Sequence, residues 1–123
     1  MRALVIVAHG SRREASNEEV RLLSKQVHQR LKCDFELLNA GFLELAEPSI
    51  PESIIRCIKQ GATDISILPY FLSAGRHVQE DVPNEIKKVQ EIYPEVAIKT
   101  LSYIGGLPKL IDLMCDYVES EIV

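Results

Sequence analysis

Two histidines have side chains that could bind a metal ion. Each lies in a polar segment that follows an apolar run. His9 directly follows the apolar run 3–8, and His77 follows the apolar run 63–70 after a short loop. Neutral imidazoles with carboxylates nearby suit cobalt, nickel or iron, whereas magnesium and calcium prefer oxygen ligands. Two ligands leave coordination positions open, which favours a metal that is held briefly over a closed structural site. A purely structural role for each histidine is the alternative.

Charged residues in the same segments could complete such a site or bind an anionic ligand. Carboxylates that could complete or orient the metal site are Glu44, Glu80 and Asp81. A basic patch that could receive a polycarboxylate is formed by Arg12, Arg13 and Arg76. The alternative for these arginines is that they are solvated loop charges.

Strands and helices alternate along the chain and must position these residues. Apolar runs and turn residues predict strands at 3–8, 35–41, 63–70 and 95–101. A capping box of Ser16 and Glu19 predicts a first helix that ends near Lys32. Ser49 and Glu52 repeat that spacing and predict a second helix that stops before Gly61.

The remaining helices follow the third and fourth strands. Asp81, with Pro83 in the first turn, predicts a third helix that Pro94 ends. A last helix is expected after Pro108, and one side of it is apolar. We expect that side to face the core with Leu110, Met114, Tyr117 and Val118.

Strand–helix alternation predicts an α/β fold with a four-stranded parallel sheet and helices on both faces, in a single domain over residues 1–123. The expected strand order is 2-1-3-4. In that order the connections of strands 1 and 3 leave toward opposite sides, so a crevice opens between their carboxyl ends. His9 and His77 are therefore expected at one rim of the sheet.

Composition excludes several classes of function. The 123 residues are 46% hydrophobic and 26% charged, as in a globular domain, and the net charge of −4 argues against a general nucleic-acid binder. The apolar run behind Arg2 is too short for a membrane span or a secretory signal, so the cytoplasm is the expected location. No CxxC, GxGxxG or Walker pattern supports a thiolate metal site or a nucleotide site.

Three segments together resemble a known family. AHGSR follows the first strand, GFLELAEPSI follows the second, and LPYFLSAGRHVQEDVP follows the third. The chain is similar along its whole length to the short, single-domain sirohydrochlorin chelatases of the small CbiX type. The resemblance implies the class II chelatase fold, in which a short chain corresponds to half of a two-domain enzyme and pairs as a homodimer.

The resemblance also implies roles for individual residues. His9 would be a metal ligand and the proton acceptor of catalysis, and His77 the second metal ligand. The substrate would lie against Glu44 and the segment Leu72, Ser73, Ala74, Gly75, Arg76 and His77. The partners would be sirohydrochlorin and a second copy of the chain, with no nucleic acid and no membrane.

The implied reaction is insertion of Co2+ into sirohydrochlorin during cobalamin biosynthesis, with the divalent metal as a substrate and no permanently bound cofactor. Iron or nickel as the metal, for sirohaem or coenzyme F430 synthesis, is an alternative, because imidazole accepts all three ions. A non-catalytic protein that carries a metal or a tetrapyrrole is another.

Overall fold

In a computed structural model that describes residues 1–122, except for the side chain of His77, strands and helices alternate as expected. The elements are β1 (Arg2–Ala8), α1 (Glu14–Arg30), β2 (Leu37–Phe42), α2 (Ile50–Lys59), β3 (Asp64–Pro69), the π-helical turn η1 (His77–Asp81), α3 (Val82–Ile92), β4 (Ala97–Thr100), the 3-10 turn η2 (Ile104–Gly106) and α4 (Pro108–Ile122). In this part of the chain no helix has the length and apolar character to cross a membrane.

The strands form one parallel sheet in the order β2-β1-β3-β4, which confirms the predicted topology. β1 is central because its residues from Ala3 to Ala8 are all apolar and all buried, so the strand can accept a neighbour at each side and layers on both faces. Val5 lies opposite Asn39 of β2 and Ile67 of β3.

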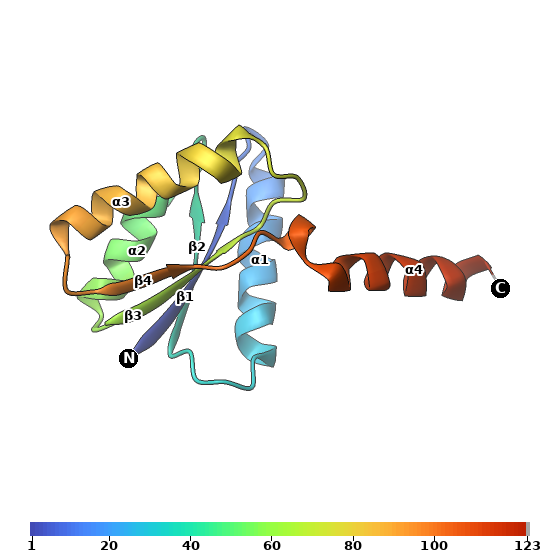
Figure 1. Ribbon diagram of the computed structural model, residues 1–123, viewed down its shortest axis with the longest axis horizontal. Helices are drawn as coiled ribbons and strands as arrows, with labels where there is room; N and C mark the ends of the chain where they lie inside the picture. The colour runs from blue at the N-terminus through green and yellow to red at the C-terminus, as the bar shows by residue number, and fades with distance from the viewer. Residues whose placement is uncertain (123) are drawn as a thin grey trace.

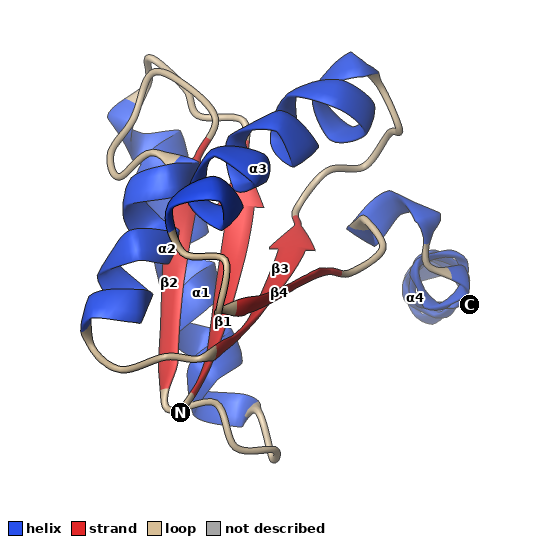
Figure 2. Cartoon of the chain, turned by 60° about the vertical axis from the view of Figure 1, so that its left-hand side comes forward, coloured by secondary structure: helices blue, strands red, loops and turns tan. Residues whose placement is uncertain are grey.

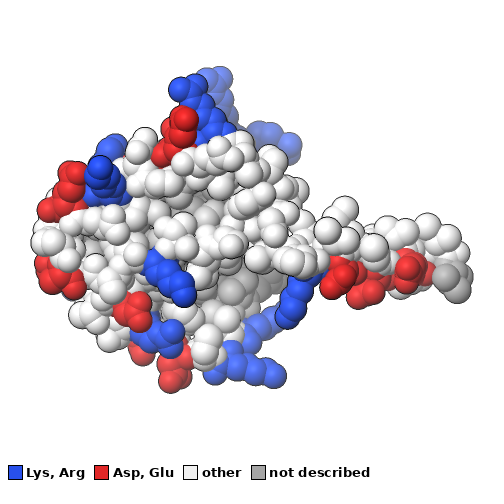
Figure 3. Space-filling view, in the orientation of Figure 1, with Lys and Arg blue, Asp and Glu red and all other residues white. Residues whose placement is uncertain are grey.

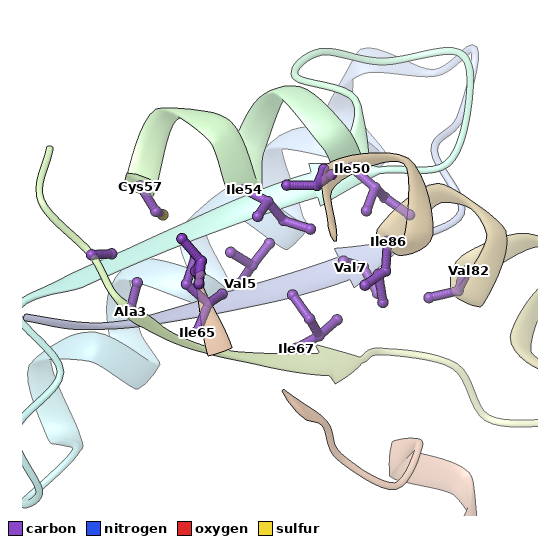
Figure 4. Packing of buried hydrophobic residues seen from close by; sticks show 13 residues of the cluster. Ala3, Val5, Val7, Ile50, Ile54, Cys57, Ile65, Ile67, Val82 and Ile86 are labelled. Atoms are coloured by element: carbon purple, nitrogen blue, oxygen red, sulfur yellow. The ribbon is translucent and has the colours of Figure 1, made fainter. Parts of the chain in front are cut away.

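Helices cover both faces of the sheet, as predicted. α1 lies on one face, and α2 and α3 lie on the other (Figures 1 and 2). The main apolar cluster fills the space between the sheet and the α2/α3 layer (Figure 4). Its fully buried members include Val5, Ile54, Ile65, Ile67 and Val89. Burial of each such side chain stabilises the fold by about 1.5–3 kcal/mol.

α2 begins as its sequence predicts. The hydroxyl of Ser49 accepts a hydrogen bond from the Glu52 N–H at 3.2 Å, and Pro51 lies in the first turn. α1 begins earlier than predicted, because Arg13 is its N-cap residue and the helix starts at Glu14. The expected capping box of Ser16 and Glu19 therefore does not form.

The last helix does not pack as predicted. α4 extends away from the rest of the molecule and carries the C-terminal end of the chain outward (Figure 1). Between Pro108 and Ile122 no residue is fully buried. The expected inward direction is wrong within one copy for Met114, Tyr117 and Val118, which are exposed, whereas Leu110 is half-buried. The helical periodicity was correct, but no part of the described chain covers the apolar side of α4.

Candidate functional site

The loops that follow β1, β2 and β3 meet at the carboxyl edge of the sheet, because parallel strands end on the same side. His9 follows β1 directly, and Glu44 follows β2 in the loop that leads to α2. His77 begins η1, after the segment 70–76 that follows β3. The backbone positions of both predicted metal ligands therefore lie beyond the ends of neighbouring strands.

His9 and Glu44 form the central contact of the rim. The His9 Nε2 atom lies 3.0 Å from a carboxylate oxygen of Glu44. The two side chains are 43% and 54% exposed, so a ligand can reach them from solvent. A carboxylate beside an imidazole fixes the orientation of the ring. The structure therefore brings together two of the residues predicted from the sequence.

Gly10 makes this contact possible. Its φ of +94° lies in the left-handed region, and a Cβ atom at this position would lie 1.7 Å from the carbonyl oxygen of Glu44. The loop after β2 can approach His9 because residue 10 has no side chain. The Glu44 N–H also donates to the His9 carbonyl at 3.1 Å, which ties the two loops together through their backbones.

Asn17 holds the loop that carries His9. The side chain is 1% exposed and spans the loop: the Ser11 N–H donates to its oxygen at 2.9 Å, and its amide donates to the Ser11 carbonyl at 2.8 Å. Our sequence analysis missed this residue. The helical period could have revealed it, because Asn17 lies three residues before Val20 and therefore on the same inward face of α1.

The segment after β3 is ordered by local hydrogen bonds. The Arg76 Nε donates to Glu80 at 3.1 Å, and the Gln79 amide donates to the Ala74 carbonyl at 3.1 Å. The π-helical turn η1 then leads directly into α3, and such turns are frequent at functional sites. The predicted ligand His77 begins this turn, but its side chain lies outside the described residues.

An open cavity of about 420 Å³ has Glu44 in its wall. Its walls come from the loop after β2 and from the start of α3. They are formed by Leu43, Glu44, Asp81, Asn84, Glu85 and Lys88. Glu44 therefore belongs both to the contact with His9 and to the wall of the cavity, which also includes Asp81, a predicted carboxylate of the site.

Exposed apolar side chains stand beside these polar groups. Leu72 is 73% exposed and Leu45, next to Glu44, is 55% exposed. Leu45 also has a φ of +63°, a backbone conformation that costs about 1–3 kcal/mol in a non-glycine residue and is concentrated at functional sites. The rim therefore combines a carboxylate and an imidazole with apolar surface.

The predicted arginine patch is only partly free to bind an anion. Arg12 and Arg13 are exposed, but Arg76 forms an ion pair with Glu80. Among the described residues no group of three histidine, cysteine or acidic side chains is close enough to hold a metal ion.

The CbiX family model matches residues 3–121 of the chain. A sirohydrochlorin ferrochelatase of Priestia megaterium is 34% identical over 100% of this chain and 46% of its own length. A sirohydrochlorin cobaltochelatase of Methanocaldococcus jannaschii is 36% identical over 74% of this chain and 62% of its own length. The chain thus spans about half the length of these curated relatives.

A solved structure supports the same relationship. SirB from Bacillus subtilis with Fe3+ superposes on 99% of this chain with a TM-score of 0.87 and 30% sequence identity. The match covers 48% of the SirB chain, so this chain has the fold of one half of that protein.

Proposed function

We propose, because the chain belongs to the CbiX family, that it inserts a divalent metal ion into sirohydrochlorin and that Co2+ is its metal. The observation that carries the proposal is the 3.0 Å contact of His9 with Glu44 at the exposed rim of the sheet. Relatives act on the same tetrapyrrole with iron or with cobalt. The imidazole and carboxylate ligands of this rim accept cobalt, nickel and iron alike.

Metal insertion requires a base, since the two pyrrole N–H groups of the macrocycle lose their protons when the metal enters. Imidazole titrates near neutral pH and can accept such protons. Glu44 holds the His9 ring. In this proposal His9 is both the first metal ligand and the acceptor of a pyrrole proton. The metal is a substrate in this reaction, and the products are the metallated ring and two protons.

His77 completes the proposed site as a second metal ligand. Its backbone lies at the start of η1, beyond the end of β3, which is the neighbour of the strand that precedes His9. The flat ring of the substrate would lie on the apolar rim at Leu72 and along the segment Ser73, Ala74, Gly75 and Arg76. Arg76 would bind a carboxylate of the substrate by exchanging its partner Glu80.

The proposal includes a homodimer. One copy offers a single rim with exposed side chains, and a macrocycle requires contacts on more than one side to be held. The relatives that span about twice this length contain room for a second unit in the same chain. A second copy would supply the other side of the cleft.

The test is a metal-insertion assay. Purified protein is mixed with sirohydrochlorin and with Co2+, Ni2+ or anaerobic Fe2+ in separate reactions, and the change in absorption is followed. We expect insertion faster than without protein, with the highest rate for Co2+. Loss of a general base or metal ligand should reduce the rate about 10²–10⁴-fold in His9→Ala and in His77→Ala.

His28→Ala is the matched control. His28 lies on α1 and bonds the Phe35 carbonyl, before the start of β2 and thus at the opposite edge of the sheet from His9. Its rate should equal that of the wild type. A wild-type rate equal to the protein-free rate would refute the enzyme and favour a metal or tetrapyrrole carrier.

A further inference from the structure

α4 presents a wide apolar surface that no other part of the described chain covers. Its large side chains Ile111, Leu113, Met114 and Tyr117 are each 59–66% exposed. Their spacing places them on one broad side of the helix, while the acidic side chains gather along one edge (Figure 3). A helix with such a surface is stable when it is buried against another element.

The connection before α4 directs the helix away from its own sheet. The Gly105 N–H donates to the Phe71 carbonyl at 2.9 Å. A Cβ atom at residue 105 would lie 1.8 Å from the Leu72 carbonyl oxygen, so the two segments are in close backbone contact. The connection before α4 is therefore fixed to the segment that follows β3.

The sheet has an open trough on the face that α1 covers. β3 is buried on its α2/α3 side at Ile65 and Ile67, but Ser66 and Leu68 on the opposite side are only half-buried. α1 packs against β2, and in the described part of the chain no helix lies beyond it over β3 and β4 (Figure 2). We call this surface, between α1 and β4, the open trough.

The wall of the open trough is apolar with basic margins. The side of α1 away from β2 forms a groove lined by Leu23, Gln26, Val27, Arg30 and Leu31. On β4 the core residue is Ile98, so the alternation of a strand places Lys99 on the trough side. These cations complement the acidic edge of α4, which carries Asp112, Asp116 and Glu119.

We infer that α4 of one copy lies in the open trough of a second copy, and that the second copy returns its own α4 in the same way. This exchange buries the apolar side of α4, covers the exposed strands and closes the dimer about a two-fold axis. The inference rests on the proposed homodimer and specifies how it is held.

Sedimentation of purified wild-type and variant chains tests the exchange from the α4 side. The wild type should behave as a dimer of twice 13.8 kDa. Met114→Glu should halve the apparent mass and keep the circular dichroism of the fold, because Met114 contacts no core in the single copy. Lys109→Glu is the control, because it introduces the same glutamate on the polar edge of α4. This variant should remain a dimer. A monomeric wild type would overturn the inference.

A matched pair of substitutions tests the trough. Leu23 lines the groove, whereas its neighbour Leu22 is 56% exposed on another side of α1. Leu23→Glu should dissociate the dimer, and Leu22→Glu should not. Equal effects of the two substitutions would contradict the exchange.

Disulfide cross-linking decides between exchange and back-folding even where Leu23→Glu lowers stability. Gln26→Cys and Met114→Cys are combined in a Cys33→Ser, Cys115→Ser chain, since these two native cysteines are exposed. We expect a disulfide-linked dimer after mild oxidation. A second chain carries Leu22→Cys in place of Gln26→Cys. A bridge within one chain, or a dimer that cross-links through Leu22→Cys but not through Gln26→Cys, would overturn the inference. Failure of the chelatase proposal would instead appear as a cross-linked wild-type-like dimer without metal insertion.

Discussion

His9 and Glu44 are joined twice, once through their side chains and once through their backbones. Nε2 of His9 lies 3.0 Å from Oε1 of Glu44, and the Glu44 N–H donates to the His9 carbonyl at 3.1 Å. The backbone hydrogen bond fixes the position of the loop after β2, and this loop places the Glu44 carboxylate beside the His9 ring. The imidazole is therefore oriented before any ligand arrives.

Removal of the Glu44 carboxylate should slow metal insertion while the fold is retained. In Glu44→Gln the amide can still contact the ring, but the negative charge beside the imidazole is lost. Partners that orient a metal-binding histidine are worth about 10–100-fold in activity or metal affinity, and we expect a decrease of that size in the insertion assay. Glu91→Gln, an exposed change on α3, is the control. Equal rates in both variants would contradict the orienting role.

A methyl group at residue 10 should separate the two loops. Gly10→Ala places a Cβ atom in contact with the Glu44 carbonyl and requires a left-handed φ, which costs an L-residue about 1–2 kcal/mol before the clash is counted. We expect urea unfolding to show a loss of more than this amount. Gly75→Ala should change stability little, because nothing lies within 4 Å of its added Cβ. A fully stable Gly10→Ala would refute this account of the rim.

Loss of the buried amide of Asn17 should destabilise the protein and the rim together. Asn17→Ala leaves the Ser11 N–H and carbonyl without their partners, at a cost of about 1–3 kcal/mol. The insertion rate should fall as well, since the loop carries His9. Ser24→Ala, also buried on α1, removes a hydroxyl that bonds the Val20 carbonyl of its own helix, and should cost under about 1 kcal/mol. Similar losses in both would argue against the clamp.

The start of α1 should contribute stability that depends on pH. Hydrogen bonds from Arg21 and then from Asn17 hold the pKa of Glu14 below its usual value of 4.5. Because the folded pKa is lowered, this stabilisation is present above about pH 4.5 and is lost as the pH falls through the folded value. Glu14→Gln should therefore be less stable than the wild type near neutral pH, and the difference should shrink in acid.

Chemical unfolding at several pH values checks this expectation. The exposed change Glu95→Gln serves as the control. High salt should also reduce the Glu14 contribution, because the carboxylate is exposed to solvent and its attraction to Arg21 is screened. A difference that grows toward low pH would contradict a lowered pKa of Glu14 in the folded protein.

The sheet order could be predicted because each strand has a distinct local signal. The apolar run of β1 marks a central strand, and the long connections allow only parallel pairing. Strand ends were less accurate: β2 begins at Leu37 rather than at residue 35, and β4 is limited to Ala97–Thr100. Hydrogen bonds to the neighbouring strand set these limits, and no single strand encodes them.

The site was predictable where residues follow strands directly. His9 comes one position after β1, so its place at the rim follows from topology. Contacts that depend on loop conformation, such as the close approach of Glu44 to Gly10, require the positions of two segments at once. α4 could not be placed, because amphipathicity identifies a side that needs cover but not which molecule supplies it.

The direction of β1 has a practical consequence. Its seven residues separate Met1 from the loop of His9 by roughly 20 Å at the rise of an extended strand. An affinity tag or surface linker joined to Met1 therefore leaves the entrance for the macrocycle unobstructed, whereas one joined after α4 would lie beside the helix that the inferred exchange buries. Immobilised protein for ligand-capture measurements is best tethered through its first residue.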